Sequence, residues 1–315
     1  MTNEQIIFSE NGVMCYYDFD SKEKGVLCSK PNCEHKPFDS TTNPDPVCNA
    51  VTDEGTEYTA LIYSDGFVYA ITDNTANSKL YKYDIKNDTK KMIAEFDFLV
   101  SGNAWLSDDK LIMQTYSLNF DETGLGDTNG STYNFCIYDL KNNTSKFTDL
   151  AGGTFISTNY LDGNKIYYGS YIDNDKNVKV STHCYDINTN RDTEVLKDNA
   201  IFLYDNGKGY YSVTEADETK MYMAELNGGK SKLIGNGYIN QAFDDKLLYF
   251  DGKKYLVYNN ETKESAECAD ISGAIERIDH KHTIYVNSDE ELCFIPTDDF
   301  LKGKDTTEII SRGQQ

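Results

Sequence analysis

A short pattern recurs along this chain and restricts its possible folds more than any other feature. In each copy a turn containing Asp and Gly, Asn or Lys leads into a strand with paired aromatic residues, and a second strand follows that ends in Tyr-Asp. Clear copies occupy residues 64–69 with 80–84, 161–168 with 184–186, and 244–250 with 257–259. Such repetition indicates stacked structural units, because one unit cannot bury its apolar face alone.

The number of copies follows from the strand-closing pair. Seven such pairs occur, at Tyr17-Asp18, Tyr83-Asp84, Tyr138-Asp139, Tyr185-Asp186, Ala224-Glu225, Tyr258-Asn259 and Ile295-Pro296. Dividing 315 residues by seven gives 45 residues per copy, which matches a four-stranded propeller blade of about 40–45 residues. No segment has the helical spacing of apolar residues over several turns. The sequence therefore predicts an all-β chain, a seven-bladed β-propeller of four-stranded antiparallel blades.

The repeat continues along the chain without a segment typical of a linker. Only five prolines occur, four of them at residues 31–46 within one segment between the first two copies, and no Ser/Gly-rich stretch separates the copies. We therefore predict one propeller domain over residues 1–315, with an insertion containing Cys and His at about residues 28–50. Residues 165–171 and 246–251 combine paired aromatics with aliphatic residues, which predicts strands in the interior of their blades. The first copy is the shortest and has segments for only three strands.

The charge balance excludes several classes of partner. The chain carries 52 acidic against 30 basic side chains, a net charge of −22. A nucleic-acid-binding protein needs basic residues that replace the counterions of phosphate, and anionic membrane surfaces disfavour an acidic chain for the same reason. The sequence also has no apolar segment of transmembrane length. We expect a monomer that binds a protein or a glycan, and no nucleic acid.

The chemically most specific segment lies between the first and second copies. Cys28, Cys33, His35 and Cys48 have the spacing C-x4-C-x-H-x12-C. Three thiols and one imidazole are a sufficient donor set for a tetrahedral structural zinc site. Four donors would complete the coordination shell of the metal, so catalysis at this metal is not expected. We predict these four residues as the metal ligands, with zinc as the cofactor.

Two other states of these cysteines remain open at this stage. A disulfide from Cys28 to Cys33, or from Cys33 to Cys48, would suit a protein exported to an oxidising compartment. Alternatively, the thiols are unpaired and act as small buried apolar groups. The remaining cysteines lie mostly at comparable places in separate copies, which predicts structural roles. His280 and His282 could form half of a metal site, but an exposed turn is the simpler interpretation.

The cysteine segment also carries a resemblance to known proteins. Residues 27–35 and Cys48-Asn49-Ala50, followed by the Asp-Gly, Tyr-Tyr and Tyr-Asp repeats, resemble uncharacterised propeller proteins of clostridial and other gut Firmicutes bacteria. Those proteins are described as similar to the propellers of the low-density-lipoprotein receptor or the translocation protein TolB, and many are exported lipoproteins. Here residues 37–47 separate His35 from Cys48, a longer interval than in similar proteins. The resemblance implies a propeller anchored at the cell surface, and it implies no established activity.

Two classes of function follow. The first is a non-catalytic cell-surface domain for binding or scaffolding, which engages a protein or a glycan. The alternative is a propeller enzyme, a lyase or hydrolase with its site over the central channel. The sequence contains neither a G-x-S-x-G nor an H-E-x-x-H motif, so binding is favoured.

The start of the chain leaves two interpretations open. It lacks the basic and apolar regions of a secretory signal, and the first copy is short. A leader removed from an exported protein accounts for both features. A cytosolic protein with a three-stranded first blade accounts for them as well. We expect the exported, surface-retained form.

Overall fold

The computed structural model describes residues 5–53, 56–74, 77–120, 126–150, 155–173, 178–215, 218–228 and 230–311, and their side chains except those of residues 102, 117–120, 126–132, 155–159 and 173. The chain divides into two compact units, Met1–Leu150 and Ala151–Gln315. The single domain over residues 1–315 stays a prediction.

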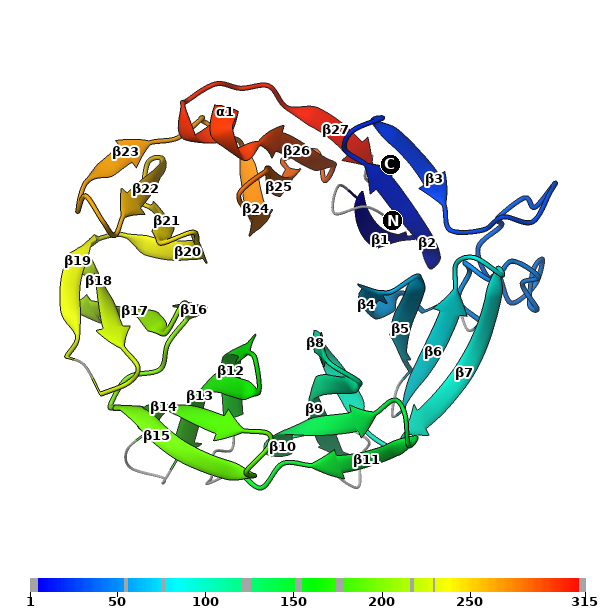
Figure 1. Ribbon diagram of the computed structural model, residues 1–315, viewed down its shortest axis with the longest axis horizontal. Coiled ribbons are helices and arrows are strands. Elements are labelled where there is room, and N and C mark those ends of the chain that lie inside the picture. The colour runs from blue at the N-terminus through cyan, green and yellow to red at the C-terminus, as the bar shows by residue number, and fades with distance from the viewer. Residues whose placement is uncertain are drawn as a thin grey trace. The chain divides into compact units, whose positions relative to one another are not determined.

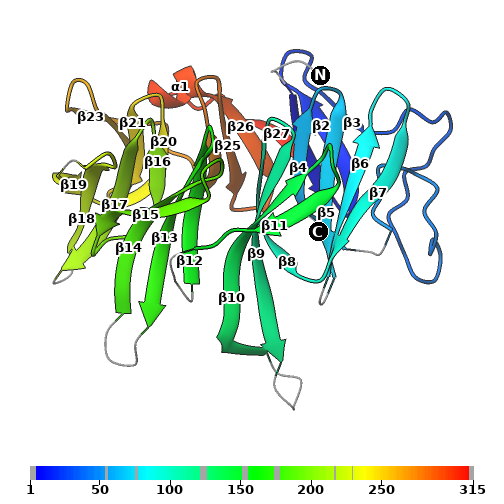
Figure 2. The ribbon, with the colours of Figure 1, turned by 60° about the horizontal axis from the view of Figure 1, so that its bottom comes forward.

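Unit 1 consists of three antiparallel sheets in which the strands follow chain order. The first sheet contains β1 (Gln5–Glu10), β2 (Val13–Asp18) and β3 (Glu23–Val26). The second contains β4 (Tyr58–Ser64), β5 (Phe67–Asp73), β6 (Ser78–Asp84) and β7 (Thr89–Phe96). The third contains β8 (Leu99–Ser107), β9 (Lys110–Phe120), β10 (Gly126–Asp139) and β11 (Thr144–Phe147). Figure 2 shows β9 and β10 extending beyond their neighbours as a long hairpin.

Unit 2 consists of four antiparallel sheets with the same strand order. The fourth sheet contains β12 (Phe155–Asp162), β13 (Lys165–Asp173), β14 (Val178–Asp186) and β15 (Arg191–Lys197). The fifth contains β16 (Leu203–Asp205), β17 (Lys208–Glu215), β18 (Glu218–Glu225) and β19 (Lys232–Asn236). The sixth contains β20 (Tyr238–Phe243), β21 (Lys246–Phe250), β22 (Tyr255–Asn259) and β23 (Ser265–Glu267). The seventh contains β24 (Gly273–Ile278), β25 (His282–Asn287), β26 (Leu292–Pro296) and β27 (Glu308–Ser311), with the short helix α1 (Thr297–Leu301) before β27.

These sheets confirm the predicted fold class, a seven-bladed β-propeller (Figure 1). Within each unit the first strands of successive sheets are in contact, as β4 with β8 and β16 with β20 show. The interior position of residues 165–171 and of the strand at residues 246–250 is also confirmed, because β13 and β21 each have a neighbour on both sides. Six sheets have four strands. The first sheet has three strands within the described residues, so the prediction of four strands in every blade needs that correction.

The hairpin turns explain why Asp or Asn stands beside Gly in the repeat. Asp65-Gly66 joins β4 to β5, and both residues have positive φ, 50° and 84°. Asn206-Gly207 joins β16 to β17 in the same way, with φ of 47° and 78°. Two-residue turns of this kind match the right-handed twist of antiparallel strands and require the left-handed conformation that Gly, Asn and Asp tolerate best.

The second residue of the strand-closing pair ends its strand through its side chain. Asp139 Oδ1 accepts hydrogen bonds from the backbone N–H groups of Lys141 and Asn142 at 3.0 and 2.8 Å. The Oδ1 atoms of Asp18, Asp186 and Asn259 likewise accept hydrogen bonds from the backbone N–H groups two and three residues later. These side-chain bonds give the backbone an alternative to the sheet ladder, so the chain turns there.

The apolar cores lie between neighbouring sheets of one unit. One core combines residues of β2, β4, β5 and β6 with Leu27, Cys48, Ala50 and Val51 of the segment that follows β3. Another joins Tyr210 of β17 to Tyr249 and Tyr258 of the sixth sheet. Tyrosine supplies some of the largest fully buried side chains, namely Tyr83, Tyr168, Tyr185 and Tyr210. This burial agrees with the interpretation of the Tyr-rich strands as packing between blades.

Candidate metal centre

The segment between β3 and β4 forms a long polar loop beside the second sheet (Figure 1). Residues 28–50 contain no strand, only the isolated bridge between Asp39 and Asn43. Both ends of the loop are attached to β2, because Leu27 N donates to Met14 O at 2.9 Å and Met14 N donates to Ala50 O at 2.7 Å. The predicted insertion therefore leaves the sheet and returns to it at the same residue.

The loop brings all four predicted ligands to one place. The ligand atoms of Cys28, Cys33, His35 and Cys48 lie within 4.8 Å of one another. His35 Nδ1 is 3.3 Å from Cys48 Sγ. Cys48 is 3% exposed, and the other three residues are half-buried. Cys48 belongs to the cluster despite the long interval after His35, since the loop folds back on itself.

Two left-handed residues shape the part of the loop that carries Cys33 and His35. Asn32 and His35 have φ of 59° and 50°, and Cys33 N donates to Lys30 O at 3.3 Å in a turn. Cys33 and His35 are two residues apart, so in an extended strand both side chains would point to the same face of a straight backbone. Here the turn curves the backbone around the cluster, so both side chains reach Cys48.

The electrostatics of the cluster differ among the thiols. Burial raises the pKa of Cys48 to about 12 and also raises the pKa of Cys28. Desolvation acts in the same direction at Cys33, but the backbone N–H of His35 and the neighbouring thiols outweigh it and lower the pKa of Cys33. Thiolates, not thiols, bind metals. A divalent cation would supply the positive charge that three adjacent thiolates need, and its binding would release their protons.

The outer side of the cluster faces an open pocket of about 380 Å³. Its lining includes Asn32, Glu34, Lys36 and Asn43 in addition to three of the four ligands. Lys30 Nζ donates to Val47 O at 2.5 Å and ties the two arms of the loop together. The cluster therefore lies at the molecular surface, where an ion from solution can reach it.

The other cysteines and histidines stay separate from this centre. All eight cysteines lie within the described residues, and all are free thiols. Cys15, Cys136 and Cys293 are buried in strands, in agreement with structural roles. His280 is exposed, and His282 Nδ1 lies 3.8 Å from Asp279 Oδ1. Among the described residues, the cluster at Cys28 is the one group of at least three such side chains with metal-binding spacing.

A line of polar groups in the fourth sheet was not predicted from the sequence. Ser181 Oγ is 3.1 Å from His183 Nε2, and His183 Nδ1 is 3.2 Å from Asp192 Oδ2. The order Ser, His, Asp is that of a hydrolase triad. However, Ser181 is 1% exposed and His183 is 7% exposed. A buried hydroxyl cannot reach a substrate, so the arrangement is a buried polar part of the core, in which His183 Nδ1 lies near Asp192 without a hydrogen bond. The spacing of Ser181 and His183 on one strand face was the available signal.

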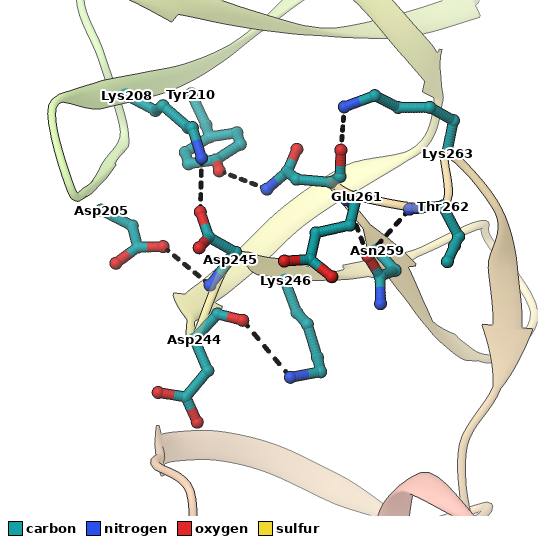
Figure 3. Close-up of polar contacts among 11 residues, drawn as sticks. Asp205, Lys208, Tyr210, Asp244, Asp245, Lys246, Asn259, Glu261, Thr262 and Lys263 are labelled. Atoms are coloured by element: carbon teal, nitrogen blue, oxygen red, sulfur yellow. Dashed lines mark hydrogen bonds and ion pairs between the residues drawn. The ribbon is translucent and has the colours of Figure 1, made fainter.

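A second polar group joins the fifth and sixth sheets of unit 2 (Figure 3). Lys208 Nζ forms an ion pair with Asp245 Oδ1, and Asp245 N donates to Asp205 Oδ2 at 3.2 Å. Asn260 Nδ2 donates to the hydroxyl of Tyr210 at 2.7 Å. The Lys208 ammonium lowers the pKa of Asp245, whereas burial raises the pKa of Asp205. These opposite charges are already paired within the protein, which is typical of a contact between blades.

Comparison with known proteins identifies the fold. No family model and no curated protein matches the chain. The β-propeller domain of the Trilobed protease from Pyrococcus furiosus is similar over 100% of this chain and 97% of that domain, with a TM-score of 0.58 and 10% identity. An uncharacterized protein from Listeria monocytogenes EGD-e is similar over 80% of this chain and 82% of its own, with a TM-score of 0.52 and 14% identity.

The acylaminoacyl peptidase of Pyrococcus horikoshii is similar over 98% of this chain, with a TM-score of 0.59 and 10% identity. This chain spans about half the length of that peptidase, 50%. At such low identity these similarities support the fold and no activity. Within the described residues, no helix has the length and apolar character needed to cross a membrane.

Proposed function

We propose that this chain is a non-catalytic binding or scaffolding propeller whose insertion is held by a structural zinc ion. The convergence of the four donor atoms within 4.8 Å carries the proposal. Zinc–sulfur and zinc–nitrogen bonds of about 2.3 and 2.0 Å place tetrahedral ligands roughly 3.5–4 Å apart. The ligand atoms of Cys28, Cys33, His35 and Cys48 therefore need only small adjustments to surround one ion.

A structural role is favoured over a catalytic one by the number of donors. Three thiolates and one imidazole fill a tetrahedral shell, so no position is left for water or a substrate. The soft thiolates also favour zinc over calcium or magnesium, which prefer oxygen ligands. Residues 28–50 have no strand pairing that would order them. The bound ion would hold the loop in place instead.

Metal analysis of the purified, reduced protein tests the zinc site. We expect one equivalent of zinc, lost on treatment with a strong chelator and regained on addition of zinc alone. Cys33→Ser should lower the zinc content to below one half, whereas Cys268→Ser, a half-buried thiol outside the cluster, should leave it unchanged. A metal-free protein with one or two disulfides would instead support the oxidised form of the cluster.

We further propose that the protein is exported and retained at the cell surface, and that it engages a protein or a glycan there. The net charge of −22 and the resemblance of the cysteine segment to surface propellers of gut Firmicutes support this location. Protease treatment of intact cells that express the native gene tests it. Digestion of the protein on intact cells is expected, and complete protection until lysis would contradict the proposal.

Binding and catalysis are separated by what happens to the partner. In a panel of immobilised glycans and purified surface proteins, a binding domain retains its partner unchanged. The enzyme alternative predicts shortened or modified products instead, and mass spectrometry of the recovered partners distinguishes the two outcomes.

A further inference from the structure

A carboxylate outside the ligand set touches both ends of the loop. Asp88 lies in the turn between β6 and β7, has φ of 47° and is 8% exposed. Its Oδ2 accepts a hydrogen bond from Ser29 N at 3.2 Å and lies 3.7 Å from Cys28 Sγ. Its backbone carbonyl oxygen accepts a hydrogen bond from Asn49 Nδ2 at 2.5 Å. Ser29 follows the first ligand and Asn49 follows the last, so one turn of the second sheet holds both ends of the ligand loop.

The position of Asp88 carries a different residue in other copies of the repeat. The residue five places after the strand-closing tyrosine is asparagine in the third and fourth copies. There the hydroxyls of Tyr138 and Tyr185 lie 3.3 Å from Asn143 Oδ1 and Asn190 Oδ1. In the second copy the hydroxyl of Tyr83 lies 2.8 Å from Asp88 Oδ1.

The chemical difference between the two residue types accounts for the substitution. An asparagine has one acceptor oxygen, which the tyrosine uses. Aspartate has two, so Oδ1 can face Tyr83 while Oδ2 faces Ser29 N. Aspartate therefore appears in the copy that also anchors the cysteine loop.

We propose that Asp88 is the positioning residue of the metal centre, which fixes the backbone beside Cys28 and Cys48 so that the four donors are arranged before an ion binds. This inference rests on the proposed zinc site. Outer-shell partners of metal ligands usually contribute about 10–100-fold to metal affinity. Asp88→Ala removes the acceptors for Ser29 and Tyr83, and we expect zinc affinity to fall by a factor in that range.

Competition with a chelating dye measures the zinc affinity at a temperature where each variant is fully folded. Asn143→Ala is the matched control, since it removes the tyrosine partner in a blade without the cluster. Asp88→Asn keeps one acceptor oxygen, and we expect it to recover part of the affinity lost in Asp88→Ala. The thiolate-to-metal absorption of the Co²⁺ form provides a second readout, with weaker and shifted bands in Asp88→Ala only.

The possible outcomes are distinct. A wild-type protein that binds no zinc refutes the metal site itself. A wild-type protein that binds zinc, together with an Asp88→Ala variant of equal affinity and equal Co²⁺ spectrum, refutes the role of Asp88 alone. If Asp88→Ala does not fold, Asn49→Ala decides, because it removes the two hydrogen bonds from Asn49 Nδ2 to the backbone oxygen and Oδ1 of Asp88 and leaves the contacts of Asp88 with Ser29 and Tyr83 in place. A loss of about tenfold supports the inference, and wild-type affinity overturns it.

Discussion

At the scale of single residues, the buried polar groups of the fourth sheet have a clear structural role. His183 lies between Ser181 and Asp192, and its ring stacks on Tyr168 with the centroids 5.4 Å apart. The Tyr168 hydroxyl donates to Asp192 Oδ2 at 2.6 Å. Ser181 and Tyr168 therefore supply hydrogen bonds to a buried imidazole and a buried carboxylate, and losing a partner there is costly.

His183→Ala should lower the free energy of unfolding by about 2–4 kcal/mol, because it leaves a cavity and removes the imidazole beside a buried carboxylate. His280→Ala, which truncates an exposed imidazole, should change stability by less than about 0.5 kcal/mol. Denaturant unfolding measures both. Equal stabilities of the two variants would contradict the role given to His183.

At the scale of the secondary-structure elements, the strand-closing carboxylates link stability to pH. Hydrogen bonds from backbone N–H groups lower the pKa of Asp18 and Asp186, and the side chain and backbone of Asn87 lower that of Asp84. These residues are half-buried at turns, and their charged form is the one that the folded state stabilises.

Because the folded state lowers these pKa values, the unfolded chain binds more protons when the pH falls below about 5. Stability should therefore be constant near neutrality and decrease as the pH falls through the range below the ordinary aspartate value. The denaturant midpoint of the zinc-free protein between pH 6 and pH 3 measures this effect without metal release. Asp186→Asn should flatten the profile, since asparagine forms the same turn at Asn259. An unchanged profile in this variant would count against the argument.

The first strand of the seventh sheet depends on a glycine. A Cβ atom added to Gly273 would lie 2.1 Å from the carbonyl oxygen of Val286, which belongs to the backbone and cannot rotate away. Gly273→Ala should cost about 1–3 kcal/mol or more. In Gly235→Ala the added atom meets only Met221 Cε at 3.4 Å, so this control should be nearly neutral. Thermal unfolding compares the two variants, and equal melting temperatures would be inconsistent with the contact.

At the scale of the whole molecule, stability in a repeat fold is largely a sum of contacts between neighbouring blades. The candidate metal centre touches the first and second sheets, through β2 and Asp88. Its influence should therefore be largest in these two sheets and decline with the number of blades between them and the blade observed.

Hydrogen exchange of the zinc-bound and zinc-free protein measures this decline. On zinc removal, amides in residues 27–52 and in β2 should exchange about tenfold faster or more, and amides of β16–β23 should keep their rates. The Cys33→Ser variant should show the same pattern without a chelator. Faster exchange throughout unit 2 would indicate that the blades unfold as one cooperative block.

The sequence alone determined the class and repeat number of the fold. The seven strand-closing pairs and the Asp-Gly turns act locally, through side-chain hydrogen bonds and backbone conformation, so their effect is readable residue by residue. The candidate ligands were also identifiable, because zinc requires particular donor types and Cys28, Cys33, His35 and Cys48 provide them within a short segment.

Only the tertiary structure decided which residues meet across the chain. Cys48 joins the cluster because both ends of the loop form hydrogen bonds with Met14. Asp88, which lies 40 residues after Cys48 in the sequence, contacts the two ends of the loop from the turn between β6 and β7. Likewise, Ser181 and His183 look like any alternating strand until burial and the position of Asp192 are known. Such contacts depend on how separate strands pack, and packing between distant segments leaves no periodic signal in a single sequence.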